Sequence, residues 1–142
     1  MGGGGGSVSS IDLSKLTDVA ERRLKQLAQG GTRILFACER VDRKALESHL
    51  ARSASFDPKK YEVVDASSGM AYEELVRRCS MVVVFTAEAK DTTYLDRIVE
   101  RTLELKKQGV HAKAADDSNI PAKATAYRWP SLRWSKLEDM FA

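Results

Sequence analysis

Polar and acidic side chains follow a continuous apolar run near the middle of the chain. Residues 81–89 read Met-Val-Val-Val-Phe-Thr-Ala-Glu-Ala. Polar residues separate this run from a helical pattern that extends over Lys90 to Gly109. Such a run is typical of a strand covered on both faces, which here leads into a helix. In open α/β sheets, small ligands bind outside the carboxyl end of a central strand. The segment from Thr86 to Asp96 is therefore the first candidate for a binding surface.

Two further strand ends are predicted to lie at the same edge. Residues 32–38 are predicted to form the first strand, and residues 61–65 a short one that leads into the small polar turn 66–69. Backbone N–H groups at the next helix start would favour an anion, although serine and glycine are also the ordinary residues of a simple turn. Both interpretations of the turn stay open. A small ligand held at this edge would contact Ala37, Cys38, Glu39, Ser67, Ser68, Thr86 and Tyr94.

Strands alternate with helices along the rest of the chain. This order predicts one parallel, doubly wound five-stranded sheet with right-handed crossovers. Residues 1–10 are glycine-rich and predicted to be a flexible linker outside the fold, and residues 11–142 form a single domain with an extra helix over 11–29. The other predicted helices span 41–54, 72–79, 90–109 and a capped start at 135–138, and the other strands span 110–114 and 124–129.

Composition and motifs give no support to several classes of function. The net charge is +3, and acidic and basic residues alternate along the helices, so no nucleic-acid partner is expected. No apolar run approaches the roughly 20 residues of a membrane helix. Cys38 and Cys79 lack metal-site spacing and predict two buried thiols in a reducing, cytoplasmic setting. His49 lies on the apolar side of a predicted helix, where a packed imidazole is the ordinary interpretation. The hydrolase, P-loop, zinc-protease and dinucleotide fingerprints are absent.

Several segments together resemble the TIR-like domains of bacterial antiphage signalling systems such as Thoeris. The resemblance covers roughly residues 32 to 138 and implies a flavodoxin-like α/β fold that works in antiviral signalling through self-association or a partner protein. The segments that carry it are Arg33-Ile-Leu-Phe-Ala, Tyr61-Glu-Val-Val-Asp-Ala, Val76-Arg-Arg-Cys-Ser-Met-Val-Val-Val-Phe, Thr92-Thr-Tyr-Leu, Ile120-Pro and Trp134.

The resemblance also implies NAD as substrate or ligand. Active members of that family cleave NAD at the nicotinamide–ribose bond and hydrolyse or cyclise the product. Their signature after the third strand is a small polar residue, a spacer, an aromatic residue, an aliphatic one, two spacers and a glutamate. The departing nicotinamide leaves an oxocarbenium-like ribose, and a carboxylate held against the ribose hydroxyls stabilises that charge.

Two registers of this signature are possible here, and they disagree about the glutamate. Thr92 to Leu95 fit its first half, but that register puts Ile98 in the glutamate position. Counting back from Gly109 puts Glu100 there instead. At about 100° per residue, Glu100 points roughly 140° away from Leu95, which lies on the apolar side of the helix, so Glu100 is expected to face solvent. Asp96 lies at the rim, where it also fits a helix-capping role. The candidate catalytic carboxylates are therefore Glu100 and Asp96, with an ordinary surface or capping charge as the alternative for each.

A second resemblance is to response-regulator receivers. Residues 33–39 and 61–69 are similar to their first two strands and turn, but receivers need a phosphorylatable aspartate at the end of the third strand, where this chain has Phe85 and Thr86. Two hypotheses result. The domain binds or processes NAD, or it is a catalytically inactive interaction module, either degenerate TIR-like or degenerate receiver-like, that works by self-association or partner binding.

Overall fold

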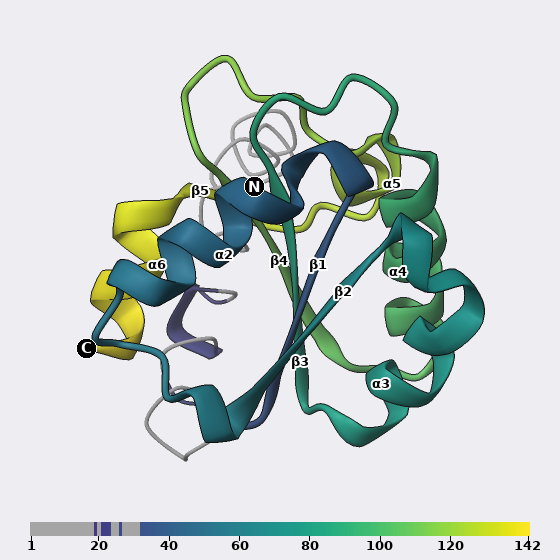
Figure 1. Ribbon diagram of the computed structural model, residues 1–142. Coiled ribbons are helices and arrows are strands. Elements are labelled where there is room, and N and C mark those ends of the chain that lie inside the picture. Colours follow the sequence, from purple (N-terminus) through teal and green to yellow (C-terminus); the bar gives the residue numbers. More distant parts are fainter. Residues whose placement is uncertain (1–18, 20, 24–25, 27–31) are drawn as a thin grey trace, which may run out of the picture.

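Five parallel strands form one sheet in a computed structural model that describes residues 19, 21–23, 26 and 32–142 (Figure 1). The strand order is β2-β1-β3-β4-β5, and every neighbouring pair is parallel. This is the flavodoxin-like order, and it confirms the predicted fold class. The strands are β1 (Ile34–Cys38), β2 (Tyr61–Asp65), β3 (Met81–Thr86), β4 (Gln108–Lys113) and β5 (Ser131–Arg133).

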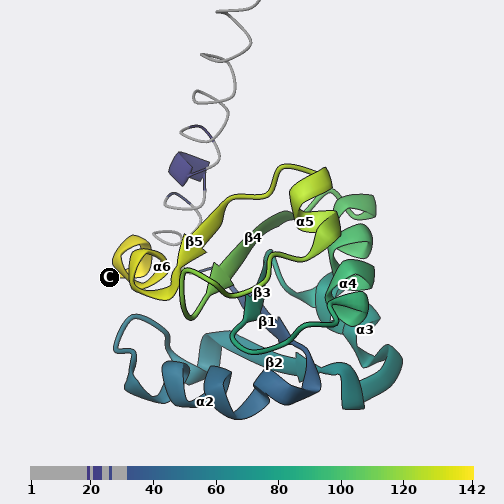
Figure 2. The same ribbon diagram turned by 90° about the horizontal axis from the view of Figure 1, so that it is seen from above.

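Helices cover both faces of the sheet (Figure 2). Side chains of α2 and α6 pack on one face with Phe36 and Phe85, and side chains of α3, α4 and α5 pack on the other with Ala37 and Val84. Every residue of β1 and β3 is buried, as expected for central parallel strands. The α-helices are α2 (Arg43–Arg52), α3 (Tyr72–Arg78), α4 (Thr93–Glu104), α5 (Ala122–Ala126) and α6 (Trp134–Phe141), and the short 3₁₀ helices are η1 (Arg40–Asp42), η2 (Pro58–Lys60) and η3 (Ala66–Ala71).

The long helix after β3 is shorter than its sequence pattern predicted. Helix α4 ends at Glu104, because Lys106 adopts a positive φ of 56° and the chain then enters β4 at Gln108. Its buried side carries Tyr94, Leu95, Ile98, Val99 and Thr102. These positions recur three or four residues apart, as on the apolar face of a helix packed on a sheet. This burial fixes the rotation of α4 and thus the direction of every other side chain on it.

The prediction of a strand over residues 124–129 was wrong. This stretch begins with helix α5, and the fifth strand follows it at Ser131–Arg133. Ala122-Lys-Ala-Thr-Ala is rich in helix-forming alanine, and the Lys123 N–H donates to Asp96 Oδ1 at 2.9 Å, which caps the start of the helix. The predicted capping box at Ser135 is also not formed, because α6 begins at Trp134, two residues earlier than a Ser135 cap requires, and Arg133 occupies its N-cap without a side-chain bond.

Trp129 explains the glycine near the start of β4. A Cβ added at Gly109 would lie 2.2 Å from the nearest atoms of the Trp129 ring, so only glycine lets the indole approach this strand so closely. The Trp129 N–H donates to the Ala124 carbonyl at 2.9 Å and holds the residue at the end of α5. The segment between β4 and β5 is thereby fastened to the sheet.

Most of the predicted N-terminal segment lies outside the described residues. This holds for the linker over residues 1–10 and, apart from residues 19, 21–23 and 26, for the helix over 11–29. Within the described part of the chain, no helix is long and apolar enough to cross a membrane.

Candidate functional site

The carboxyl ends of β1 and β3 form the switch point of the sheet, where ligands bind in open α/β folds. After β1 the chain turns to α2 on one face, and after β3 it turns to α4 on the other (Figures 1 and 2). The two loops therefore start side by side and then diverge. What fills the space between them decides whether a ligand can enter there.

Asp42 joins these two loops. Its carboxylate is 1% exposed and accepts three hydrogen bonds from consecutive backbone N–H groups of the loop after β3. Oδ2 accepts from Ala87 at 2.9 Å and from Ala89 at 3.2 Å, and Oδ1 accepts from Glu88 at 2.8 Å. Consecutive N–H groups of this kind make an anion-binding site in many proteins. Here the anion is a side chain of the same domain.

Glu39 makes a similar link to the start of α4. Its Oε2 accepts from the Leu95 N–H at 3.1 Å, and the residue is 9% exposed. Burial raises the pKa of the Glu39 carboxyl above its ordinary value, and the hydrogen bond from Leu95 partly opposes that rise. Glu39 is therefore close to the centre of the predicted site, but its carboxylate already has a partner in the chain.

The Asp65 carboxylate likewise accepts a hydrogen bond from the backbone of the turn after β2. Its Oδ1 accepts from the Ser67 N–H at 2.7 Å and from the Ser67 hydroxyl, while the Ser68 hydroxyl accepts from the Asp65 N–H at 3.4 Å. Arg43 donates to Asp65 Oδ2 at 2.8 Å. Burial alone would raise the pKa of Asp65, but the hydrogen bonds from Ser67 and Arg43 outweigh it and hold this pKa below its ordinary value. The two predicted serines are thus exposed parts of a capping box.

A hollow of about 770 Å³ opens at the same edge, beside the Asp42 link. It is bounded by Val41, by residues 87–90 after β3 and by residues 114, 115 and 117–119 after β4. Small side chains make much of its wall, and its charged groups are Glu88, Lys90 and Asp117. Pockets for small molecules have volumes of about 300 to 1,000 Å³, so the hollow is large enough for a nucleotide.

The two candidate catalytic carboxylates lie away from this hollow. Asp96 Oδ1 accepts from the Lys123 N–H at 2.9 Å, and Oδ2 accepts from the Thr92 hydroxyl at 3.4 Å. The side chain of Glu100 is 49% exposed on the outer side of α4, with its Oε1 4.0 Å from Lys123 Nζ. Ile98, the other position in the family register, is fully buried in the core. Neither carboxylate lines the hollow.

The remaining predicted wall residues are buried within the fold. Ala37, Cys38 and Thr86 are each 0% exposed, and Tyr94 is 8% exposed. Burial raises the pKa of the Cys38 thiol to about 12, so this cysteine is protonated at neutral pH. Tyr94 packs edge-on against Tyr72 with ring centroids 5.7 Å apart, and its buried hydroxyl has no hydrogen-bond partner among the described residues. These residues form the floor beneath the loops.

Thr86 belongs to a buried hydrogen-bond chain that the sequence did not reveal. Its hydroxyl donates to the Asn119 carbonyl at 2.6 Å, so the same oxygen must accept from His111 Nε2 at 2.7 Å. His111 Nδ1 then accepts from the Ser131 hydroxyl at 2.7 Å. The ring is neutral, because burial lowers the pKa of His111 to about 4. The chain ties β3, β4 and β5 to the loop before α5, and its two central residues, Thr86 and His111, are each 0% exposed.

His49 is a packed histidine, as predicted. Its Nδ1 lies 2.9 Å from the Ala45 carbonyl, and its ring packs against Phe85 and Trp134. The described residues contain no group of three or more histidine, cysteine or acidic side chains that could hold a metal ion.

No protein-family model and no curated protein sequence matches this chain. The class that the structure defines is therefore the flavodoxin-like α/β domain, with its loops joined at the switch point by carboxylates of its own chain.

Proposed function

We propose that this domain is a non-catalytic interaction module for signalling that works through the loops at the carboxyl edge of its sheet. The observation that carries the proposal is that Glu39, Asp42 and Asp65 already occupy the backbone N–H groups of these loops. Nucleotide phosphates bind in such folds by accepting from loop amides of this kind. Because these amides are already bonded within the chain, the exposed side chains of the loops are the groups left for an external contact.

The positions of exposed apolar side chains also indicate that the carboxyl edge is the contact surface. Of the six large apolar side chains exposed among the described residues, three belong to loops at carboxyl ends of strands. Val41 is 62% exposed after β1, Met70 60% after β2 and Ile120 45% after β4. Single exposed apolar residues are common on any protein. Three on one edge, with Val41 at the rim of the hollow, favour burial against a second protein.

The positions of Asp96 and Glu100 weigh against NAD cleavage by either residue. Cleavage at the nicotinamide–ribose bond needs a carboxylate against the ribose as positive charge develops. Asp96 caps the start of α5, and Glu100 faces outward on α4. In the family register the corresponding place holds Ile98, whose hydrocarbon side chain is in the core.

A second candidate is binding of NAD or a related nucleotide in the hollow beside Asp42. The volume of about 770 Å³ and the position next to the switch point favour it. In this version Lys90 is the cation available to the phosphates, since it lines the hollow. The nucleotide would then act as ligand, and any processing of it would need a group other than the two predicted carboxylates.

The experiment that separates these functions follows nicotinamide release from NAD across a range of protein concentrations. We expect no release. Glu100→Gln is compared with Glu104→Gln, a matched change of another exposed glutamate on α4. Release that Glu100→Gln abolishes and Glu104→Gln preserves would overturn the proposal. Saturable NAD binding without release, weakened by Lys90→Gln, would favour the second candidate.

Self-association through the carboxyl edge is tested by light scattering on the same samples. We expect the mass to rise with concentration and Val41→Asp to prevent the rise, because a buried charge opposes an apolar contact. Leu103→Asp is the control, since Leu103 is 45% exposed on α4, away from the carboxyl edge. If Val41→Asp and Leu103→Asp reduced the rise in mass equally, the carboxyl edge would not be the contact surface.

A further inference from the structure

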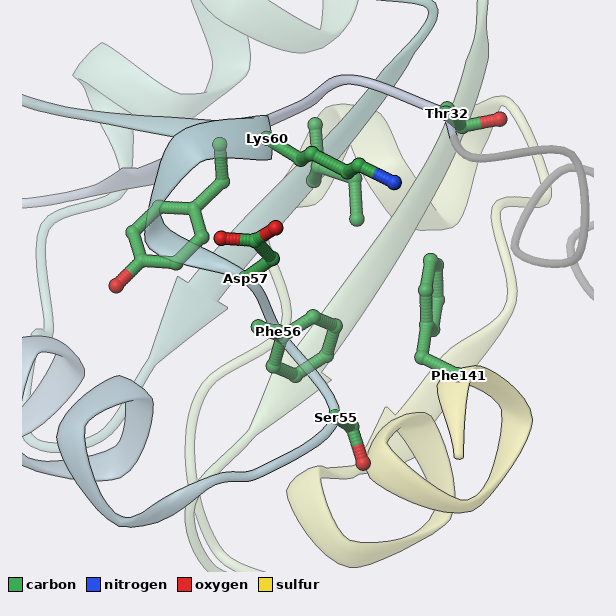
Figure 3. A pocket seen from close by; sticks show the side chains of 8 residues that line it. Thr32, Ser55, Phe56, Asp57, Lys60 and Phe141 are labelled. Carbon is green, nitrogen blue, oxygen red and sulfur yellow. The ribbon is translucent and has the colours of Figure 1, made fainter.

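A second pocket lies at the opposite, amino edge of the sheet, between η2 and the end of α6 (Figure 3). Its volume is about 210 Å³, below the range of pockets for drug-sized ligands, so its ligand must be small. It is far from the hollow in the fold, because β1 and β2 begin here and end at the carboxyl edge. No residue of the predicted site lines it.

The wall of this pocket is aromatic and fixed by the core. The Phe56 and Phe141 ring centroids lie 5.1 Å apart with 50° between the ring planes. Phe56 is 5% exposed and also packs edge-on against Phe36, which holds its ring in place. Ile34 and Tyr61 complete the apolar part of the lining. Such a wall favours an apolar or single-ring group of a ligand.

Two opposite charges line the same pocket without pairing. In the view of Figure 3 the Lys60 side chain extends toward the side of Phe141, and the Asp57 carboxylate lies between the Lys60 side chain and the Phe56 ring. Asp57 Oδ1 accepts from the Lys59 N–H at 2.9 Å and caps η2. Within the described residues no ion pair of 4.0 Å or less joins Lys60 to Asp57. Each therefore keeps bonding capacity for a ligand.

We propose that this pocket binds a free α-amino acid with an apolar or aromatic side chain. The ligand carboxylate bonds to the Lys60 ammonium, the ligand ammonium bonds to the Asp57 carboxylate, and the side chain lies on the Phe56 and Phe141 wall. Asp57 and Lys60 are both exposed, so a ligand with a single charge would gain one charged contact and leave the other protein charge hydrated. A zwitterion of this size satisfies both at once. The site is separate from the carboxyl edge and does not rest on the proposed function.

Three probes of one shape test the charges on the ligand. L-Phenylalanine carries both, 3-phenylpropionate lacks the ammonium, and phenethylamine lacks the carboxylate. We expect isothermal titration of the full chain to give saturable binding of L-phenylalanine, with each of the other two at least about tenfold weaker, as loss of a charged hydrogen bond predicts.

Matched variants test the charges on the protein. Lys60→Gln should weaken L-phenylalanine about tenfold or more, and Lys59→Gln, one residue away in η2 but outside the pocket lining, should leave it unchanged. Asp57→Asn keeps a helix-capping side chain and should weaken L-phenylalanine without weakening 3-phenylpropionate. Thermal melts confirm that each variant is folded.

Three results would overturn the site. One is equal affinity of the unmodified protein for L-phenylalanine and 3-phenylpropionate. Another is an equal loss in the Lys59 and Lys60 variants, which would mean nonspecific charge attraction. The third is no saturable binding of L-phenylalanine at millimolar concentrations.

Discussion

The two edges of the sheet use their charged side chains in opposite ways. At the carboxyl edge, Glu39, Asp42 and Asp65 are at most 9% exposed and each accepts hydrogen bonds from loop amides. At the amino edge, Lys60 and Asp57 line one pocket without forming an ion pair with each other. At the edge where this fold ordinarily binds ligands, the loop amides are thus bonded to carboxylates of the chain itself, whereas the pocket at the other edge keeps two unpaired charges for an external partner.

Burial accounts for the difference. A carboxylate can be removed from water only if other groups satisfy it, so the three buried acids must be structural parts of the loops they hold. An exposed charge stays hydrated and needs no partner in the chain. The comparison therefore predicts large effects on stability from changes at the carboxyl edge and small ones from changes in the amino-edge pocket.

The largest effect is expected from Asp42→Ala. The change removes the acceptor for three N–H groups, of which that of Ala89 is buried, and should destabilise the domain by about 3 kcal/mol or more. Asp42→Asn should cost about half as much, because its one oxygen can still accept from Ala87 and Ala89 while its NH₂ group faces the N–H of Glu88. Urea unfolding with an unchanged m-value measures both.

An Asp42→Ala variant as stable as the unmodified protein would break the comparison. It would mean that water or a solute anion replaces the carboxylate at no cost, and that the loop amides are free to bind phosphate. Inorganic phosphate should then stabilise this variant and leave the unmodified protein unchanged, which a thermal melt with and without phosphate detects.

A smaller, pH-dependent effect is expected at Asp65. The folded pKa lies below the ordinary value of 3.8, so the stability that Asp65 contributes is fully present above pH 3.8 and is lost as the pH falls through the folded pKa. Asp65→Asn should cost about 1 to 2 kcal/mol at neutral pH, and the difference between the two proteins should shrink below pH 3.8. Urea unfolding at several pH values measures this difference.

Glu39 also contributes to the pH dependence of stability, and it does so in both the Asp65→Asn variant and the unmodified protein. The difference in unfolding free energy between these two proteins therefore isolates Asp65 better than either curve alone. The folded pKa of Glu39 is raised above the ordinary value of 4.5, so its contribution is present below pH 4.5 and is lost as the pH rises through the folded pKa. The two acids therefore act in opposite directions. A difference between the Asp65→Asn variant and the unmodified protein that does not change with pH would mean that the variant's cost comes from packing and not from the charge.

The fold was predictable because its signals are local and consistent. Apolar runs at β1 and β3, alternating with amphipathic helices, admit few arrangements other than a doubly wound parallel sheet. The failure at residues 124–129 has a tertiary cause. The bond from Lys123 to Asp96, distant in sequence, stabilises a five-residue helix where the residue pattern resembled a strand.

The roles of the acids were not predictable, because each depends on contacts between residues far apart in sequence. Asp42 and Ala87 are 45 residues apart, and Glu39 and Leu95 are 56 apart. Sequence placed Glu39 correctly at the end of β1, but nothing in it distinguishes an acid facing a ligand from one bonded to a loop. His111 could have been singled out only as a polar residue in a predicted strand, and its two side-chain partners, Thr86 and Ser131, come from two other strands.

The smallest effect is expected from Lys60→Gln on stability. Because the charge has no ion-pair partner in the described residues, its removal should change the free energy of unfolding by no more than about 0.5 kcal/mol, as for most surface positions. Lys59→Gln should behave alike, and urea unfolding beside the Asp42 variants measures all of them on one scale. A loss above 1 kcal/mol for Lys60→Gln alone would mean that the chain uses this ammonium as it uses Asp42, to hold itself together. The amino edge would then be a second self-satisfied edge, because a charge already engaged within the fold has little bonding capacity left for a ligand.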